Sequence, residues 1–107
     1  MRVFLDECVD WRLSRDLVGH EVKTARQMGW AAIGNGELLA LVSGQFDVFV
    51  TVDQNLAFQQ NVRILHVAVI VLRAKSNRLM DIKPLVPDLR SMIEAAKPCA
   101  VTFVGST

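Results

Sequence analysis

The sequence predicts an α/β domain of three layers, α/β/α, built around a mainly parallel sheet. Two stretches carry this prediction, Val48–Val52 and Val67–Leu72, which are nearly continuous runs of β-branched and other apolar residues. Such runs are typical of strands that are buried on both faces, as they are in parallel sheets. Stretches with apolar residues at helical spacing alternate with the strands along the chain, which favours the α/β class.

The first unit is predicted to be a strand, a helix and a second strand. Arg2–Leu5 is the first strand, and Glu21–Thr24 is the second. Between them, apolar residues at helical spacing predict a short amphipathic helix from Asp10 to about Leu17. A β-α-β unit of this length favours a parallel pair with a right-handed crossover.

The middle of the chain is predicted to hold a glycine-punctuated loop followed by a helix. Residues 27–36 are expected to form a loop with at most one helical turn. Asn35 can cap a helix over 36–43, which Gly44 would end. Val48–Val52 then forms the third strand.

Beyond the third strand, the chain is expected to form a short helix over 56–61 and a fourth strand over 66–72. The final helix is predicted to begin at Asp81, with its first turn broken by prolines, and to end before Pro98. Ala100–Val104 is the fifth predicted strand.

Composition limits the classes of protein to which the chain can belong. The 107 residues are 51% hydrophobic and 21% charged, which predicts one globular domain over 1–107. The net charge of +1 gives no general argument for nucleic acid, so such a partner must be argued from a local patch. No apolar run reaches the roughly 20 residues of a membrane span, and the start does not look like a signal peptide. We therefore expect a cytoplasmic protein with no membrane partner, in which Cys8 and Cys99 are reduced and at least partly buried.

Two acidic residues directly follow predicted strands. Asp6 follows the first strand and Asp53 follows the third, and the carboxyl ends of parallel strands meet at one edge of a sheet. Glu37 is in the first turn of the helix before the third strand, and that helix should begin at the same edge. Three convergent carboxylates favour a divalent cation such as Mg²⁺ or Mn²⁺. Taken singly, each acid also fits a structural role as a cap or a charge near a helix N-terminus.

Basic and aromatic residues near the same edge suggest a nucleic-acid ligand. Arg73, Lys75 and Arg78 follow the fourth strand and are candidates to bind a phosphate backbone. Trp30 has two interpretations, as a residue that stacks on a base or as a residue that fills the core. Neither histidine has a spacing that suggests a metal or catalytic role.

Three segments of the chain resemble the PIN-like proteins, and in particular the small stand-alone members proposed as toxins of bacterial toxin–antitoxin pairs. The similar segments are 3–7, 35–39 and 50–56. The resemblance implies a metal-dependent ribonuclease in which Asp6, Glu37 and Asp53 hold Mg²⁺ or Mn²⁺ for RNA cleavage. It further implies an antitoxin protein as partner, while homodimerisation is left open.

Three further residues are expected to support the metal ligands, namely Glu7, Thr51 and Asn55. Asn55 stands where many PIN domains carry another acid, so a catalytically weak or inactive PIN-like interaction domain is the alternative function. A phospho-receiver-like signalling module is a second alternative. It would require a Ser or Thr after the fourth strand and a Lys after the fifth, and the chain has neither.

Overall fold

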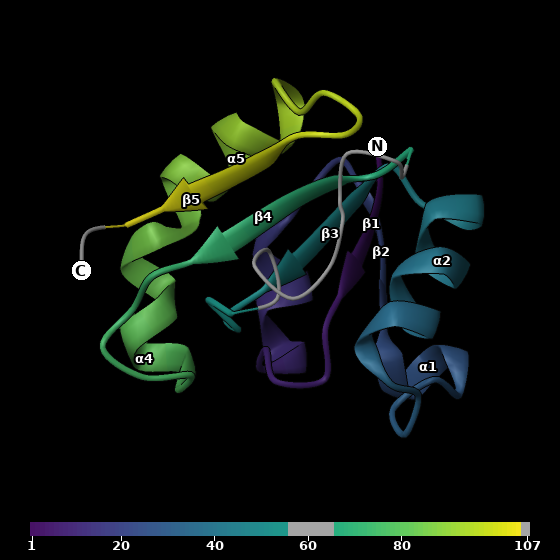
Figure 1. Cartoon of the computed structure of the whole chain (residues 1–107). Helices are drawn as coiled ribbons and strands as arrows, with labels where there is room; N and C mark the ends of the chain where they lie inside the picture. The colour runs from purple at the N-terminus through teal and green to yellow at the C-terminus, as the bar shows by residue number, and fades with distance from the viewer. Residues whose placement is uncertain (56–65, 106–107) are drawn as a thin grey trace.

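The computed structural model describes residues 1–55 and 66–105, and within them it shows a five-stranded sheet whose strands are all parallel (Figure 1). The strands are β1 (Arg2–Leu5), β2 (Glu21–Thr24), β3 (Val48–Thr51), β4 (Ala68–Leu72) and β5 (Val101–Val104). Their order across the sheet is β2-β1-β3-β4-β5. The predicted parallel α/β sheet is therefore confirmed, and β1 and β3 are neighbours in it.

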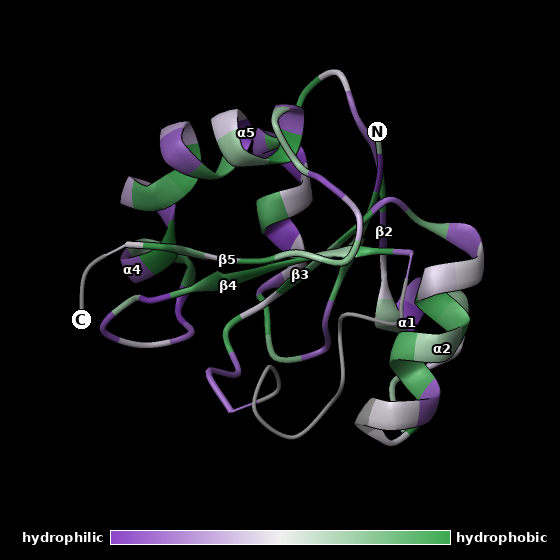
Figure 2. Ribbon diagram, turned by 45° about the horizontal axis from the view of Figure 1, so that its top comes forward, coloured by the Kyte–Doolittle hydropathy of each residue, from purple (hydrophilic) through white to green (hydrophobic). Residues whose placement is uncertain are grey.

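Helical segments cover both faces of this sheet (Figure 2). One face is covered by the 3-10 helix η1 together with α4 and α5, and the other face by α1 and α2. The bounds of these segments are η1 (Trp11–Asp16), α1 (Ala25–Met28), α2 (Asn35–Gln45), α4 (Leu79–Ile82), η3 (Lys83–Leu85) and α5 (Val86–Glu94). The helix predicted over 56–61 lies outside the described residues. No helix in the described ranges is long and apolar enough to cross a membrane.

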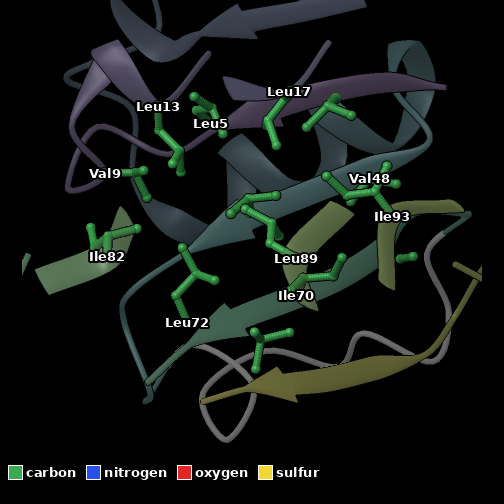
Figure 3. Close-up of a cluster of buried hydrophobic side chains, with 14 residues drawn as sticks. Leu5, Val9, Leu13, Leu17, Val48, Ile70, Leu72, Ile82, Leu89 and Ile93 are labelled. Carbon is green, nitrogen blue, oxygen red and sulfur yellow. The ribbon is translucent and has the colours of Figure 1, made fainter. Parts of the chain in front are cut away.

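The core has two halves because side chains alternate between the faces along each strand. In β1, Val3 and Leu5 pack under η1 and α5, whereas Phe4 packs under α2. Figure 3 shows the first half, in which Leu13 of η1 and Leu89 of α5 approach the same strands. Apolar residues on both sides of each central strand explain the uninterrupted hydrophobic runs in the sequence.

The path of the chain fixes where a ligand is expected. From β1 the chain moves to β2, toward one edge strand of the sheet, and from β3 it moves to β4, toward the opposite edge strand. In open α/β sheets, ligands bind beyond the carboxyl ends of the strands at this point of reversal. This rule places a ligand between the carboxyl ends of β1 and β3.

The connection from β4 to β5 brings α4 to the same face as η1. It runs along the sheet in the opposite direction to the connection from β1 to β2, yet both cover one face, so the two crossovers have opposite hands. Parallel crossovers are right-handed in nearly all proteins. Because both connections cover the same face, the segment before α4 lies beside η1 at the carboxyl edge. Residues of both segments line one groove there, which is described below.

Two helices differ from their predicted form, one in its type and the other at its ends. The segment predicted as a helix over 10–17 is the 3-10 helix η1, in which Leu17 N–H bonds the carbonyl of Ser14 three residues earlier. α2 begins at Asn35 with Gly34 as its N-cap, and it continues through Gly44 to Gln45. The predictions that Asn35 caps this helix and that Gly44 ends it were therefore wrong.

The final helical region begins earlier than predicted. α4 starts at Leu79 with Arg78 at the N-cap, so the prediction that Asp81 caps the last helix was wrong. Asp81 is instead in the first turn and accepts a hydrogen bond from the Ser76 hydroxyl. The predicted break at the prolines is confirmed, because η3 separates α4 from α5. β4 and β5 are slightly shorter than predicted.

Candidate functional site

Asp6 is the first residue after β1, at the carboxyl edge of the sheet. Its N–H donates to the carbonyl of Val50 at 2.9 Å, which continues the pairing of β1 with β3 by one residue. The chain then turns, and Val9 N–H donates to the Asp6 carbonyl at 3.0 Å. The turn leaves Asp6 only 9% exposed.

The Asp6 carboxylate is held by three donors. Oδ1 accepts from the backbone N–H of Glu7 at 2.9 Å, and Oδ2 accepts from the hydroxyl of Thr51 at 2.8 Å and from Sγ of Cys8 at 3.3 Å. Hydrogen bonds to a charged group are each worth about 1.5–3 kcal/mol in net stability. This buried carboxylate is therefore fixed in one orientation by its neighbours.

Thr51 connects the ends of the two central strands. Its Oγ1 donates to Asp6 and accepts the backbone N–H of Asp53 at 3.0 Å. Oδ1 of Asp53 in turn accepts the N–H of Asn55 at 2.9 Å, a local turn typical of an Asp after a strand. Thr51 thus contacts Asp6 directly, and its role in supporting a metal ligand stays a prediction.

The two strand-end acids line one open groove of about 420 Å³, which we call the acidic groove. Within the described residues, its lining contains no basic side chain. It consists of Asp6, Glu7, Cys8, Val52 and Asp53. Glu7 was expected to point away from Asp6 in an extended chain, but the turn after β1 brings it into the same groove. The joint placement of Asp6 and Asp53 at one edge follows the sequence prediction.

A second groove of about 540 Å³ adjoins the acidic groove and shares Asp6, Glu7 and Cys8 with it. We call it the aromatic groove because the exposed Trp11 lines it. Its remaining lining residues are Val9, Asp10, Thr24, Ala25, Arg26, Ala31, Asn77 and Arg78. Asp6 therefore lies where the acidic groove meets the aromatic groove.

Glu37 is placed differently from the two strand-end acids. It lies in the first turn of α2, which begins at the carboxyl edge of the sheet as predicted (Figure 1). Its side chain is exposed and lines neither the acidic nor the aromatic groove. Within residues 1–55 and 66–105, no three Asp, Glu, His or Cys side chains are grouped so that they are able to hold a metal ion. The three-carboxylate metal site stays a prediction.

The three basic residues after β4 are separated by the structure. Arg78 lines the aromatic groove beside Asp6, in agreement with the predicted position at this edge. Arg73 instead places its guanidinium 4.1 Å from the ring centroid of Phe103, on β5. Lys75 is exposed and lines neither groove. A role in RNA binding stays a prediction for all three residues.

The tryptophan that the sequence analysis selected, Trp30, is partly buried and packs against the core. Trp30 packs in the half of the core under α2, with ring centroids 5.8 Å from Phe4 and 6.3 Å from Phe46. Trp11 is the tryptophan that remains exposed, at 54%. The helical spacing of Val9 and Leu13 already marks Trp11 as a residue that faces outward, so this signal was present in the sequence.

Cys8 is a site residue that no sequence pattern had indicated. Its Sγ lies 3.3 Å from Oδ2 of Asp6 and 3.4 Å from Oγ1 of Thr51. Burial, more than any neighbour, raises the pKa of the Cys8 thiol, and the Asp6 charge acts in the same direction. Cys8 therefore remains a protonated thiol at neutral pH and serves as a weak donor to Asp6. It is partly buried as expected, whereas Cys99 is exposed.

The chain was compared with known proteins. No family model, no curated protein and no solved structure matches it.

Proposed function

We propose that the protein is a metal-dependent ribonuclease of the PIN-like type and that Asp6 and Asp53 hold one Mg²⁺ or Mn²⁺ ion at the carboxyl edge of the sheet. One observation carries the proposal: the two carboxylates follow adjacent parallel strands and line one groove at the point where the chain reverses its direction across the sheet. Glu37 lines neither groove, so the proposal rests on Asp6 and Asp53.

The donors present fit a hard cation. A carboxylate offers about four acceptor positions, and three donors already occupy Asp6, which leaves it about one position for an ion. Asp53 has a single donor on Oδ1, from Asn55, so more of its acceptor capacity remains. Mg²⁺ keeps several waters and is commonly held by one or two carboxylates together with substrate phosphate. Two carboxylates in an open groove meet that requirement.

The chemistry of the proposal divides between the ion and the chain. A bound divalent ion lowers the pKa of a water nucleophile and stabilises the charge that develops on a phosphodiester. The residues of the chain provide position: Thr51 and Cys8 fix the Asp6 carboxylate, and the Asn55 N–H orients Asp53. Arg78, beside Asp6 in the aromatic groove, offers a cation for the phosphate backbone.

The proposal extends to a biological role as the toxin of a toxin–antitoxin pair, which is what the resemblance implies. Under this role an antitoxin protein is the partner, and the proposed nuclease activity arrests growth when the chain is expressed without it. Expression of the wild-type chain should slow growth, and expression of Asp53→Asn should not. Equal growth in both cultures would remove the toxin role while leaving the nuclease proposal to the assay below.

The test of the nuclease proposal is a cleavage assay with purified protein. Wild-type protein is incubated with structured and unstructured RNAs in Mg²⁺, in Mn²⁺ and in EDTA. We expect cleavage in the presence of either metal, its loss in EDTA, and a rate at least about 100-fold lower for Asp6→Asn or Asp53→Asn.

Asp47→Asn is the matched control for that assay. Asp47 is an exposed aspartate just before β3, at the opposite edge of the sheet, where its carboxylate accepts the N–H of Arg2. The asparagine oxygen keeps this hydrogen bond, so the control should cleave like the wild type. Cleavage that is equal in wild type and Asp6→Asn would indicate a contaminant. No cleavage under any metal would favour the inactive interaction domain.

A further inference from the structure

The exposed side chain of Trp11 is the starting point. η1 directs Leu13 into the core, where it is fully buried, while Trp11 lies on the outer side and is 54% exposed. The guanidinium of Arg15 lies 4.9 Å from the centre of the Trp11 ring. Arg15, four residues further along the same short helix, therefore lies over the Trp11 ring.

The ring borders two hollows of the surface. It lines the aromatic groove and also a smaller hollow of about 210 Å³ that it shares with Ser14 and Gln27. Thr24 and Arg26 line both of these hollows as well. The aromatic groove, at about 540 Å³, is within the range of roughly 300–1,000 Å³ that small-molecule and cofactor pockets occupy.

Two arginines and an amide line the same groove as the ring. Arg26 comes from α1, while Asn77 and Arg78 come from the segment before α4. Within the described parts of the chain, neither Arg26 nor Arg78 takes part in an ion pair. Both guanidinium groups are therefore available to an anion, and the Asn77 side chain offers both a donor and an acceptor.

The acidic residues of this groove determine the orientation in which a ligand with an anionic group would bind. Asp10 is neutralised by Arg12, whose Nη2 is 2.7 Å from its carboxylate. Asp6 and Glu7 remain as charges at the end that joins the acidic groove. A phosphate is favoured beside the arginines, while a neutral base is tolerated beside the acids and the ring.

We propose that the aromatic groove binds one nucleotide of a single-stranded nucleic acid, with the base stacked on Trp11 and the phosphate near Arg26 and Arg78. An aromatic platform combined with a few basic residues is the usual basis of single-strand binding, because every base has a flat apolar face. Bases inside a duplex are already stacked and are not available to the ring. The inference deepens the proposed function, since it places a nucleotide next to the phosphodiester that would lie over Asp6.

Binding is measured in EDTA, so that cleavage is not needed for the result. A labelled single-stranded octanucleotide, in RNA and DNA forms of the same mixed sequence, is titrated with protein and followed by fluorescence anisotropy. In Trp30→Phe protein, where Trp11 is the single tryptophan, quenching of the intrinsic fluorescence should follow the same binding curve. Tighter binding of RNA would show that the 2′-hydroxyl is read, and equal binding would show that stacking and phosphate contact suffice; both support the proposal.

The expected effects separate stacking from charge. Trp11→Ala should weaken binding roughly 5-fold to 100-fold, and Trp11→Phe should restore most of it. Arg26→Ala and Arg78→Ala should each reduce the salt dependence of binding by a slope of about 0.7. Val18→Ala and Arg90→Ala, at an exposed apolar residue and an exposed arginine outside the groove, should bind like the wild type.

Three results would overturn the inference: no binding of either single strand by the wild-type protein, unchanged affinity in Trp11→Ala, or a duplex that binds as tightly as the single strand. The outcome is independent of the nuclease assay. Binding that depends on Trp11 without any cleavage would refute the proposed reaction and leave the nucleotide site intact.

Discussion

The hydroxyl of Thr51 donates a 2.8 Å hydrogen bond to Oδ2 of Asp6, across two adjacent parallel strands. The same hydroxyl accepts the backbone N–H of Asp53 at 3.0 Å, and its residue is fully buried. One oxygen therefore joins the two strand ends that carry the proposed metal ligands.

Replacing Thr51 with valine should lower both stability and any activity of the site. Thr51→Val keeps the size of the side chain but leaves Asp6 and the Asp53 N–H each short of one partner. We expect the free energy of unfolding to fall by about 2 kcal/mol, as measured by urea denaturation. Thr51→Ser should recover most of the loss. Thr102→Val on β5, whose hydroxyl makes no hydrogen bond within the described residues, should change little. Equal stability of wild type and Thr51→Val would show that the hydrogen bonds of the Thr51 hydroxyl do not contribute to the free energy of unfolding.

Two glycine-to-alanine substitutions should have opposite signs. Gly105 has a φ of +97°, and an added Cβ would lie 2.4 Å from the carbonyl oxygen of Arg73, so Gly105→Ala should destabilise by more than about 1 kcal/mol. Gly44 is inside α2, and an added Cβ meets no atom within 4 Å. Gly44→Ala should therefore stabilise the protein by about 0.5–1 kcal/mol. Thermal unfolding of the two variants checks both signs, and a Gly105→Ala protein as stable as the wild type would contradict the structure of this turn.

The pair formed by Asp10 and Arg12 predicts a pH dependence. The side-chain hydrogen bonds from Arg12, assisted by its backbone N–H, lower the pKa of Asp10 from 3.8 to about 2. Because the folded pKa is the lower one, the stabilisation is present above pH 4 and is lost as pH falls from about 4 to 2. Arg12→Ala should therefore differ from wild type in denaturation midpoint at pH 6 and converge with it near pH 2. High salt should reduce the difference at pH 6. A difference that persists at pH 2 would show that Arg12 acts through packing.

Most of the fold could be predicted because the information was local. The runs at Val48–Val52 and Val67–Leu72 are strands buried on two faces, and no other element type explains them as well. Helix ends were less predictable. α2 passes through Gly44 because that residue faces solvent and the chain turns only at Phe46, which is buried against Phe4 and Trp30. That tertiary contact is absent from any local pattern.

Part of the site could be predicted, because the ends of parallel strands lie at one edge of a sheet. Placing Asp6 and Asp53 together required only that β1 and β3 be parallel and adjacent. Cys8 enters the site through the turn after β1, and Trp11 and Arg26 through the packing of η1 and α1, which no spacing rule specifies. Arg78 reaches the aromatic groove because α4 lies on the same face as η1. The position of Arg78 at the carboxyl edge could be predicted because the residue follows β4, whereas its place beside η1 could not.

The most direct test of the central claim is a double-substitution cycle on RNA cleavage in Mn²⁺. If Asp6 and Asp53 hold one ion together, each single change to asparagine removes the same catalytic unit. We predict that Asp6→Asn and Asp53→Asn each lower the cleavage rate at least about 100-fold and that the double variant is no slower than either single variant. Losses that multiply in the double variant, or a rate that neither substitution changes, would contradict a shared site.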